Sequence, residues 1–571
     1  MRCKIFYNDK AVLAPEGKMT FFDEFYIDYK VEQSTEQYKI YSAFIHPKQD
    51  IHLRKLEFFI PHEFKADDQL FCNGYQSWSE SYLLDKNQKV PKLKSFAKPY
   101  FKYYGDAQFE ACDSWDLYSW SYGYVKNKQN TLLIGSLEEK SSITFIAYDV
   151  MKKGIRVSAL CDNMLLTHSF PVIKLFVAQG KEHEIFDAYF SKMEKLRKLK
   201  PRTLGWCSWY KHFNKISPTL LLEELDAYKK SIRKIKKAKA DIYFQIDDGF
   251  QHETGDWLKL KPSFKGKMLD LSNQIRKAGL IAGLWIAPFV CSKNSDIYKN
   301  KKDWLLTDEK GNALKVGYNP MWGGNYFALD VYKKGVRDYL TEVFFTYLHK
   351  WHFDLIKVDF LFAASIKARK DKKRAQQMAF AMNFIHELTK GKKFMACGVP
   401  IGASFGKVDY CRISADVHTK WEHRLLKFIN KRERVSTLAA AKSILNRWHL
   451  NQRIFISDPD VFLLRNEKND LSENQQFTLL LINMLLGSQH FTSDNLENYS
   501  KEQFAELNGL LELSESKITS VDKLGEDFWK IVFRGPKHKH QALINLSGSK
   551  KELHTLKMEG ALEAYESIIL S

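Results

Sequence analysis

The sequence predicts a multidomain protein in which an N-terminal antiparallel β-sandwich precedes a central (β/α)₈ barrel and a small C-terminal all-β domain. The chain has 571 residues, which is too many for a single hydrophobic core. Short apolar segments alternate with helical patterns only in the middle of the chain. On either side of that region, apolar and polar residues alternate in the two-residue period that is typical of β-strands.

Residues 1–180 predict the β-sandwich. Apolar and polar residues alternate there in short bursts separated by turn-forming residues, as in 55–60, 131–136 and 142–147. Many short strands of this kind, bounded by turn signals, indicate antiparallel sheets. Residues 181–202 then predict a helical linker, because apolar side chains recur at helical spacing before a proline ends the pattern.

Residues 203–512 predict the barrel, because eight apolar strands alternate there with helices. The predicted strands are 203–209, 241–248, 281–287, 354–360, 393–399, 409–415, 452–457 and 489–493. The clearest helical patterns are 217–237, 333–350, 374–390, 433–447 and 473–486. Eight such units match a (β/α)₈ barrel, whose active site lies at the strand C-termini. A doubly wound sheet is the rival topology, but no glycine-rich phosphate fingerprint opens any of these helices.

Residues 513–571 return to the alternation of apolar and polar side chains. The clearest stretches are 528–533 and 541–546. A short C-terminal β-domain is therefore predicted.

The net charge of +20 could indicate a nucleic-acid partner. The densest basic runs are 229–237 and 367–374. The first carries Ile232 and Ile235 at helical spacing, so its lysines are interpreted as the solvated face of an amphipathic helix. Lysine is spread along the whole chain, and no recognition helix or RNA-binding signature accompanies it. We therefore expect no nucleic-acid partner.

The eight cysteines are predicted to be free thiols. No two of them are close enough in sequence for a CxxC pair, and most lie in apolar, strand-like runs, where a thiol behaves as a small hydrophobic side chain. The N-terminus lacks an apolar core of signal-peptide length, and no apolar run approaches transmembrane length. A cytoplasmic protein with no membrane partner is the expectation.

Two of the predicted barrel strands run into lone aspartates, Asp359 and Asp416. A carboxylate at the tip of a buried strand is costly unless it is paired or catalytic. Two of them in one barrel suggest a nucleophile and an acid/base, the pair that breaks a glycosidic bond. Lys357 lies two residues before Asp359 on the same side of the strand, and a nearby ammonium lowers a carboxylate pKa. Arg412 lies four residues before Asp416, again on the same side if the strand stays extended.

Other strand tips suit a pyranose ring. Asp247 and Asp248 can accept hydrogen bonds from neighbouring hydroxyls, and the indole of Trp285 can stack on the apolar face of a sugar. An Asp-Asp pair is also common in turns. A metal site built from Asp247, Asp248 and Asp359 is an alternative, but Lys357 would compete with the cation.

Four further features of the predicted barrel can be explained either by a role in the structure or by a role in the pocket. Trp209 is assigned either to the core or to the wall of the pocket. Cys397 lacks an evident basic partner, so a pocket-lining thiol is favoured over a nucleophile. His418 is interpreted as a rim residue, and residues 458–460 (Asp-Pro-Asp) as a structural turn.

Five barrel segments, in order, carry a family resemblance. They read GWCSWY (205–210), FQIDDGF (244–250), LWIAPF (284–289), IKVDFLF (356–362) and RISAD (412–416). They resemble the family 36 glycoside hydrolases, which are the α-galactosidases (melibiases) and their relatives. The predicted domain plan also agrees with that family, whose N-terminal domain is a β-supersandwich.

The resemblance implies a retaining exo-α-galactosidase that releases terminal α-D-galactosyl residues from oligosaccharides such as melibiose or raffinose. It assigns Asp359 as nucleophile and Asp416 as acid/base, with carboxyl groups about 5–5.5 Å apart. It implies that the sugar is bound by Asp247, Asp248, Trp285, Lys357, Cys397 and Arg412, with Trp209 held less firmly. The motif NGYQSWS (73–79) is similar to a family loop that leans over the pocket and would bring Trp78. No metal or organic cofactor is implied.

Several alternatives stay open. The same scaffold hydrolyses α-N-acetylgalactosaminides or transfers galactose in the raffinose-synthase relatives. The loop at 417–422 (VHTKWE) lies in a stretch that varies in the family, and it faces the leaving group. A catalytically silent sugar-binding protein would need neither aspartate. Oligomerisation with copies of the same chain is also left open.

Overall fold

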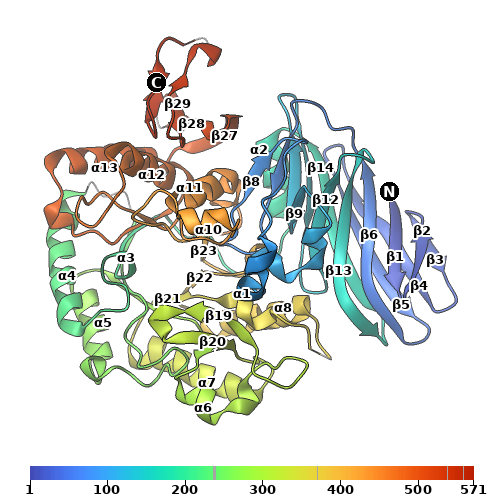
Figure 1. Ribbon diagram of the computed structural model, residues 1–571, viewed down its shortest axis with the longest axis horizontal. Helices are drawn as coiled ribbons and strands as arrows, with labels where there is room; N and C mark the ends of the chain where they lie inside the picture. The colour runs from blue at the N-terminus through green and yellow to red at the C-terminus, as the bar shows by residue number, and fades with distance from the viewer. Residues whose placement is uncertain (236–239, 370, 536–537, 557, 571) are drawn as a thin grey trace.

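The structure is a computed structural model that describes residues 1–235, 240–369, 371–535, 538–556 and 558–570. Figure 1 shows three parts: a pair of N-terminal sheets, a central region in which helices surround a parallel sheet, and a small C-terminal sheet. The protein is therefore multidomain, as predicted. No helix in the described ranges is long and apolar enough to cross a membrane.

The N-terminal part consists of two large antiparallel sheets. The six-stranded sheet has the order β2 (Lys10–Ala14), β1 (Arg2–Tyr7), β6 (Ile51–Pro61), β13 (Gly154–Leu166), β12 (Ile143–Asp149) and β9 (Tyr118–Trp120). The eight-stranded sheet has the order β3 (Lys18–Phe21), β4 (Phe25–Ser34), β5 (Tyr38–Pro47), β14 (Phe170–Gly180), β11 (Thr131–Ser136), β10 (Tyr122–Lys126), β7 (Gln69–Cys72) and β8 (Tyr82–Leu84).

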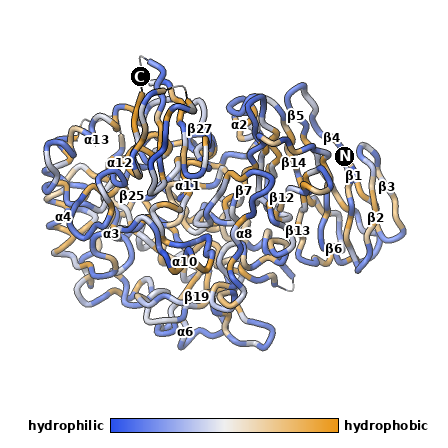
Figure 2. The backbone as a smooth tube through the Cα atoms, turned by 45° about the horizontal axis from the view of Figure 1, so that its top comes forward, coloured by the Kyte–Doolittle hydropathy of each residue, from blue (hydrophilic) through white to orange (hydrophobic). Residues whose placement is uncertain are grey.

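One hydrophobic core joins the two N-terminal sheets. It combines Leu56 and Val157 of the first sheet with Ile27 and Ile45 of the second, because each strand turns every second side chain inward. Figure 2 shows hydrophobic stretches running through the interior and hydrophilic ones at the outside. The three bursts predicted at 55–60, 131–136 and 142–147 fall in β6, β11 and β12.

The central sheet has nine strands, and every neighbouring pair is parallel. The order is β24 (Ile456–Asp458), β23 (Tyr410–Arg412), β22 (Lys393–Ala396), β21 (Leu355–Val358), β17 (Ile281–Ile286), β16 (Asp241–Ile246), β15 (Thr203–Cys207), β26 (Gln489–Thr492) and β25 (Val461–Phe462). Its two outermost strands, β24 and β25, are separated only by Pro459 and Asp460. The same chain segment therefore stands at both ends of the strand order, and the sheet curls round on itself. All eight predicted strands overlap strands of this sheet.

The helices that accompany the central sheet agree with the sequence patterns. They are α4 (Pro218–Ser231), α5 (Met268–Lys277), α7 (Lys334–Phe345), α8 (Arg374–Leu388), α11 (Thr437–Asn446), α12 (Glu473–Leu486) and α13 (Lys501–Leu513). In the predicted linker, α2 (Glu182–Ser191) ends well before residue 202 and packs on β14 and β11 of the eight-stranded sheet. Ser217 caps α4 by accepting a hydrogen bond from the amide of Leu220 at 3.2 Å. Residues 236 and 237 of the predicted helix, and Lys370 of the second basic run, lie outside the described residues.

Two differences from the predicted secondary structure have clear causes. The helix predicted at 433–447 begins only at Thr437, because the side chain of Ser436 accepts from the amide of Ala439 and caps it there. The chain between β17 and α7 forms a small antiparallel sheet that was not predicted. Its strands are β18 (Val290–Ser292), β20 (Gly324–Ala328) and β19 (Lys315–Asn319), which are too short to show a clear period.

A small antiparallel sheet ends the chain. It consists of β27 (Lys517–Gly525), β28 (Phe528–Arg534), β29 (Lys539–Asn545) and β32 (Ser567–Leu570). The ammonium of Lys126 joins it to the N-terminal part, because this group lies 3.1 Å from a carboxylate oxygen of Asp522.

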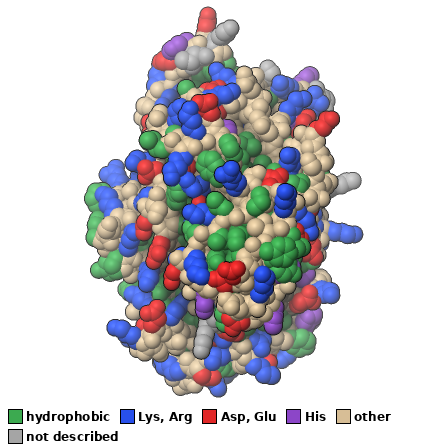
Figure 3. Space-filling model, turned by 90° about the vertical axis from the view of Figure 1, so that its right-hand side faces the viewer, with side chains coloured by type: hydrophobic (Ala, Val, Ile, Leu, Met, Phe, Trp, Pro, Cys, Tyr) green, Lys and Arg blue, Asp and Glu red, His purple; other side chains and the backbone are tan. Residues whose placement is uncertain are grey.

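The surface and the thiols agree with the composition. Figure 3 shows Lys and Arg dispersed among Asp and Glu on the face it presents, rather than gathered in one patch. Ile232 and Ile235 are buried while Lys229 and Lys230 are exposed, as the amphipathic pattern predicts. All eight cysteines are buried and free.

Arg447 fastens an N-terminal loop to the central region. It is fully buried just after α11. Its guanidinium donates to the side chain of Asn73 and to the carbonyl oxygens of Gln76, Ser77 and Ser79, at 2.7–3.3 Å. One more hydrogen bond goes to the carbonyl of Ile413, next to the end of β23. The 73–79 loop is therefore held in place by a residue of the central region.

Replacing Arg447 with methionine is expected to lower the free energy of unfolding by about 3 kcal/mol or more. Methionine fills a similar volume but leaves several buried carbonyl oxygens without donors, and each such group costs about 1–3 kcal/mol. Chemical denaturation would measure the change. The control is Arg54→Met, since Arg54 makes an exposed ion pair with Asp9, and exposed pairs contribute at most about 1 kcal/mol. Equal midpoints for the two variants would contradict the assigned role of Arg447.

Candidate active site

A pocket of about 650 Å³ opens at the carboxyl ends of the central strands. Its size lies within the usual range for small-molecule sites. The wall includes most of the residues that the sequence singled out: Trp78, Trp209, Asp247, Asp248, Trp285, Lys357, Asp359, Asp416 and His418. Cys397 and Arg412 are not among the described residues that line it. They lie buried beside its wall.

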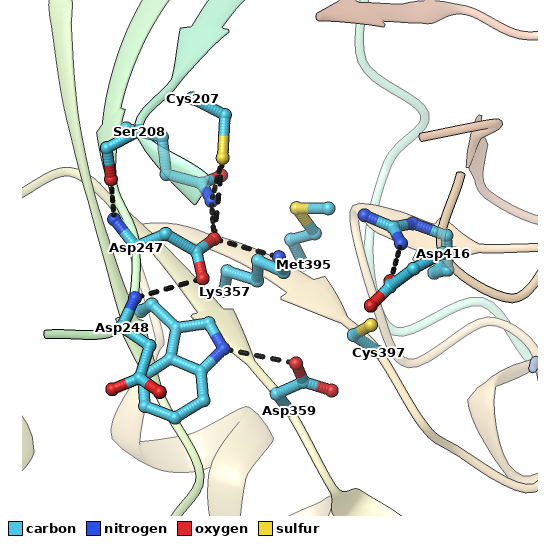
Figure 4. A network of polar contacts seen from close by, with 12 residues as sticks. Cys207, Ser208, Asp247, Asp248, Lys357, Asp359, Met395, Cys397 and Asp416 are labelled. Atoms are coloured by element: carbon cyan, nitrogen blue, oxygen red, sulfur yellow. Dashed lines mark hydrogen bonds and ion pairs between the residues drawn. The ribbon is translucent and has the colours of Figure 1, made fainter. Parts of the chain in front are cut away.

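Asp247 is held at the end of β16 by a buried polar network (Figure 4). Its Oδ2 lies 2.9 Å from the ammonium of Lys357 and accepts from the amide of Gln245 at 2.8 Å. The backbone amide of Asp247 donates to the hydroxyl of Ser208 at 2.9 Å. The carboxylate is therefore fixed in its orientation at the wall of the pocket.

Asp248 is held by two donors that compensate its burial. The amide of Gln251 donates to Oδ1 at 2.5 Å, and the indole N–H of Trp322 donates to Oδ2 at 2.7 Å. Burial nevertheless raises the pKa of Asp248 to about 6, against the opposing effect of these two hydrogen bonds. Trp322 belongs to the turn between β19 and β20, and no sequence motif pointed to it.

Replacing Trp322 with phenylalanine is expected to move the acid limb of the kcat/KM profile to higher pH by about one unit. The indole N–H stabilises the ionised form of Asp248, and a hydrogen bond to a charged group contributes about 1.5–3 kcal/mol, where one pKa unit is 1.36 kcal/mol. An ionised carboxylate can accept more hydrogen bonds from hydroxyls than a protonated one, so protonation of Asp248 at low pH is expected to weaken the binding of a sugar. The pH profile of kcat/KM measures this.

The matched control for that prediction is Trp304→Phe. Trp304 is a partly buried indole outside the pocket, so its loss should leave the acid limb where it is in the wild-type protein. An unmoved or lowered limb in the Trp322 variant would contradict the effect assigned to the indole.

Asp359 follows β21 directly and is 7% exposed. Its Oδ2 accepts from the indole N–H of Trp285 at 3.1 Å, and its Oδ1 accepts from the amide of Phe360 at 2.8 Å. Phe360 has φ = 53°, a conformation that is strained for a bulky residue and that clusters at functional sites. The carboxylate is thus turned into the pocket by a constrained turn.

The balance of charge around Asp359 differs from the sequence expectation. Burial raises the pKa of Asp359, and the Lys357 ammonium opposes this effect without cancelling it. The ammonium also pairs directly with Asp247. Lys357 therefore acts on the pKa of Asp359 in the predicted direction, but burial outweighs it and keeps that pKa above its ordinary value.

Asp416 lies in the loop after β23 and lines the same pocket, with a side chain that is 32% exposed. Its Oδ1 lies 2.7 Å from Nη1 of Arg412. In Figure 4 the carboxyl groups of Asp359 and Asp416 approach a common space from different strands, and the charge of Asp416 raises the Asp359 pKa further. One buried and one partly exposed carboxyl group therefore face one cavity.

The 73–79 loop completes the wall from the N-terminal part. The indole N–H of Trp78 donates to the sulfur of Cys397 at 3.2 Å, and its ring packs edge-on against Phe360. Gly398 allows this close approach, because it has φ = 56° and an added Cβ would lie 2.9 Å from the Trp78 ring. These contacts fix the orientation of Trp78, which lines the same pocket as Asp359.

Residues 458–460 do more than form the predicted turn. Asp458 lies 2.7 Å and Asp460 2.8 Å from nitrogen atoms of Arg412, so both carboxylates pair with the residue that contacts Asp416. Tyr210, the last residue of the first motif, also lines the pocket. His418 lines the pocket, in line with its assignment to the rim. Among the described residues, no group of three or more His, Cys, Asp or Glu side chains is placed to hold a metal ion.

The arrangement can carry out a displacement at a sugar carbon. One carboxylate deep in the cavity can attack, and a second that is reachable by solvent can exchange a proton with a leaving group or a water molecule. Fixed carboxylate oxygens and indole faces can bind hydroxyls and the apolar side of a ring.

The sequence of the central region matches known proteins. Residues 220–391 match the melibiase family model. A stretch of 141 residues is 30% identical to the α-galactosidase Mel36A of Lactobacillus acidophilus, covering 24% of this chain and 18% of that protein. A stretch of 103 residues is 30% identical to the α-galactosidase AgaA of Geobacillus stearothermophilus, covering 18% of this chain and 13% of that protein. The matched stretches thus span less than a fifth of these relatives.

The fold matches over a much larger share. The α-galactosidase TtGalA of Thermus thermophilus, solved in complex with p-nitrophenyl α-D-galactopyranoside, superposes with a TM-score of 0.69 at 23% identity, covering 94% of this chain and 98% of that one. A family 36 α-galactosidase of Geobacillus stearothermophilus, in complex with 1-deoxygalactonojirimycin, superposes with a TM-score of 0.63 at 11% identity over 92% of this chain and 74% of that one. These comparisons confirm the resemblance inferred from the motifs.

Proposed function

We propose, from a central region that carries a match to the melibiase family, that this protein is a retaining exo-α-galactosidase acting on terminal α-D-galactosyl residues of oligosaccharides such as melibiose or raffinose. The observation that carries the proposal is the placement of Asp359 and Asp416 on one pocket, after β21 and within the loop after β23. Asp359 is the nucleophile and Asp416 the acid/base.

In the first step, a carboxylate oxygen of Asp359 attacks the anomeric carbon of galactose. The bond from that carbon to the leaving oxygen breaks, and Asp416 gives its proton to that oxygen. The product is a galactosyl ester of Asp359 and a free alcohol. The indole N–H of Trp285, which donates to Asp359 Oδ2, fixes the attacking group.

In the second step, Asp416 removes a proton from a water molecule, whose oxygen attacks the same carbon. The ester bond to Asp359 breaks, and the carboxylate is restored. Two inversions give net retention. The partial exposure of Asp416 supports this role, because the group must exchange a proton with both the leaving alcohol and water.

The sugar is held by the fixed acceptors and the indoles of the pocket. Asp247 and Asp248 accept hydrogen bonds from galactose hydroxyls, and Lys357 can donate to the oxygens beside them. Trp285 forms a wall and Trp78 leans in from the N-terminal loop. Trp209 belongs to the same wall. Cys397 and Arg412 act from behind the wall, through Trp78 and Asp416 respectively.

The architecture proposed for this function is a complete (β/α)₈ barrel at residues 203–512, with β24 and β25 as two halves of one strand. The flanking units are the N-terminal β-supersandwich (1–180), the helical linker (181–202) and the C-terminal β-domain (513–571). Eight buried, unpaired cysteines support a reducing compartment such as the cytoplasm.

Turnover by the wild-type protein tests the function directly. We expect hydrolysis of p-nitrophenyl α-galactoside and of raffinose, with much lower turnover of p-nitrophenyl α-N-acetylgalactosaminide. Proton NMR during raffinose hydrolysis should detect α-galactose before the β-anomer appears by mutarotation. If β-galactose forms first, the double displacement is overturned. If the protein prefers the acetamido sugar, the substrate must be reassigned. If galactosyl transfer to an added acceptor sugar is the main reaction, the enzyme is a transferase. No turnover of any of these substrates would leave a sugar-binding protein.

A further inference from the structure

Arg412 is shared by three carboxylates. Its Nη1 lies 2.7 Å from Asp416, its Nε lies 2.7 Å from Asp458 and its Nη2 lies 2.8 Å from Asp460. Arg412, Asp458 and Asp460 are each at most 2% exposed. One buried guanidinium thus pairs with three carboxylates. Of these three carboxylates, only Asp416 lines the pocket.

The side chain of Asp460 contacts two neighbours of Asp416: the cation that pairs with it and the backbone that follows it. One of its oxygens pairs with Arg412, the cation that contacts Asp416. Its other oxygen accepts from the amide of Val417, the residue after Asp416, at 2.8 Å, and from the phenol of Tyr210. No other carboxylate in the described part of the chain has both of these contacts.

The backbone of Asp460 is constrained in a way that points to a role for its side chain. Its φ is 72°, in the left-handed region where a residue with a side chain is strained. Such strain persists where the surrounding structure holds it, as at functional sites. Its amide donates to Asp458 Oδ1 at 2.9 Å, which fixes the turn between β24 and β25.

The charge arrangement poses a difficulty for the proposed acid. A guanidinium 2.7 Å from a carboxyl group favours the ionised form, whereas an acid must hold a proton when the leaving group departs. The titratable and charged groups around Asp416 and Asp460 are Arg412, Asp359, Asp458, Tyr210, Cys207, Cys397 and the neighbouring His418. Of these, Asp458 and Asp460 both pair with Arg412, and Asp460 also holds the amide of the residue that follows Asp416.

We propose that Asp460 is a positioning residue that, by engaging Arg412 and the Val417 amide, keeps Asp416 in place and able to carry the proton for the leaving group. The inference rests on the proposed function. Its physical basis is Coulombic: a second negative charge, on the neighbouring nitrogen of the same guanidinium, weakens the pull of that guanidinium on Asp416.

The ionisation of Asp460 makes this offset dependent on pH. Burial raises the pKa of Asp460 to about 7, against the opposing effect of Arg412. Asp460 therefore gains its negative charge as the pH rises through neutrality. The offset therefore grows as the pH rises through neutrality, and the alkaline limb of the activity profile should depend on Asp460.

The test is the pH profile of raffinose hydrolysis by Asp460→Asn and Asp460→Glu. Asparagine keeps the shape but removes the charge, so the alkaline limb of kcat/KM should move to lower pH by about one unit. At pH 8 this corresponds to a loss of about tenfold. Glutamate keeps the charge, so its limb should stay at the wild-type position even if kcat falls. Limbs that are unmoved in the asparagine variant, or moved equally in both, would overturn the inference.

A second variant keeps the test decisive if Asp460→Asn does not fold. Asp458→Asn also removes a negative charge from Arg412 but leaves the Val417 amide and the Tyr210 phenol untouched. Its alkaline limb should move in the same direction, and an unmoved limb overturns the inference. Failure of the proposed function is distinguishable, because the wild-type protein would then not hydrolyse raffinose at all.

Discussion

Replacing Asp359 with glycine is expected to lower kcat/KM for p-nitrophenyl α-galactoside by about 10⁴- to 10⁶-fold, the usual cost of removing a nucleophile. The carboxylate makes the bond that replaces the one to the leaving group, and among the described residues no other carboxylate accepts a hydrogen bond from the Trp285 indole. The stability of the fold should change little by comparison, since glycine leaves space in an open pocket.

Sodium azide gives this prediction a positive readout. Azide can enter the space left by the carboxylate and attack the anomeric carbon from the same face, with p-nitrophenolate as the leaving group. One inversion then gives β-galactosyl azide, which NMR identifies. The control is Asp354→Gly, at the opposite end of β21, where the aspartate pairs with Arg276 and Lys392. Substantial azide-independent activity in the Asp359 variant would remove it as nucleophile.

Replacing Asp416 with alanine is expected to separate substrates by their leaving groups. Raffinose needs a proton on its departing oxygen, so its kcat/KM should fall by about 10²- to 10⁴-fold, the typical contribution of general acid catalysis. Nitrophenolate leaves without a proton, so kcat/KM for p-nitrophenyl α-galactoside should fall much less. Steady-state kinetics on the two substrates measures the difference.

Azide also distinguishes the role of Asp416 from that of Asp359. In the alanine variant the galactosyl ester still forms on Asp359, and azide replaces the water that can no longer be activated. Two inversions then give α-galactosyl azide, the opposite anomer to that expected from the Asp359 variant. Equal losses on both substrates, with no azide product, would show that Asp416 acts only in binding or structure.

The strand pattern of the central sheet could be predicted from sequence because buried parallel strands are continuous apolar runs. β21 and β23 are examples, since they lie within apolar stretches that run into Asp359 and Asp416. The three-stranded insertion after β17 could not be predicted in this way. Its strands have three to five residues, too few for a period, and Trp322 was therefore missed.

The electrostatic roles in the site were harder to predict than the residues themselves. Sequence spacing placed Lys357 beside Asp359, but it could not reveal that Asp247 from another strand captures the ammonium. Likewise, Asp458 and Asp460 read as a turn because their partner, Arg412, lies far away in sequence. Pairing across strands depends on the curled arrangement of the sheet, which local patterns do not encode.

The anchoring of the 73–79 loop by Arg447 bears on how this protein can be altered. Trp78 reaches the pocket from a loop whose carbonyl oxygens are held by a guanidinium of the central region. A shortened protein made only of the central region would expose that guanidinium and lose one wall of its cavity. The N-terminal part is therefore needed for a complete pocket. Recombination between relatives should exchange the N-terminal part and the central region together.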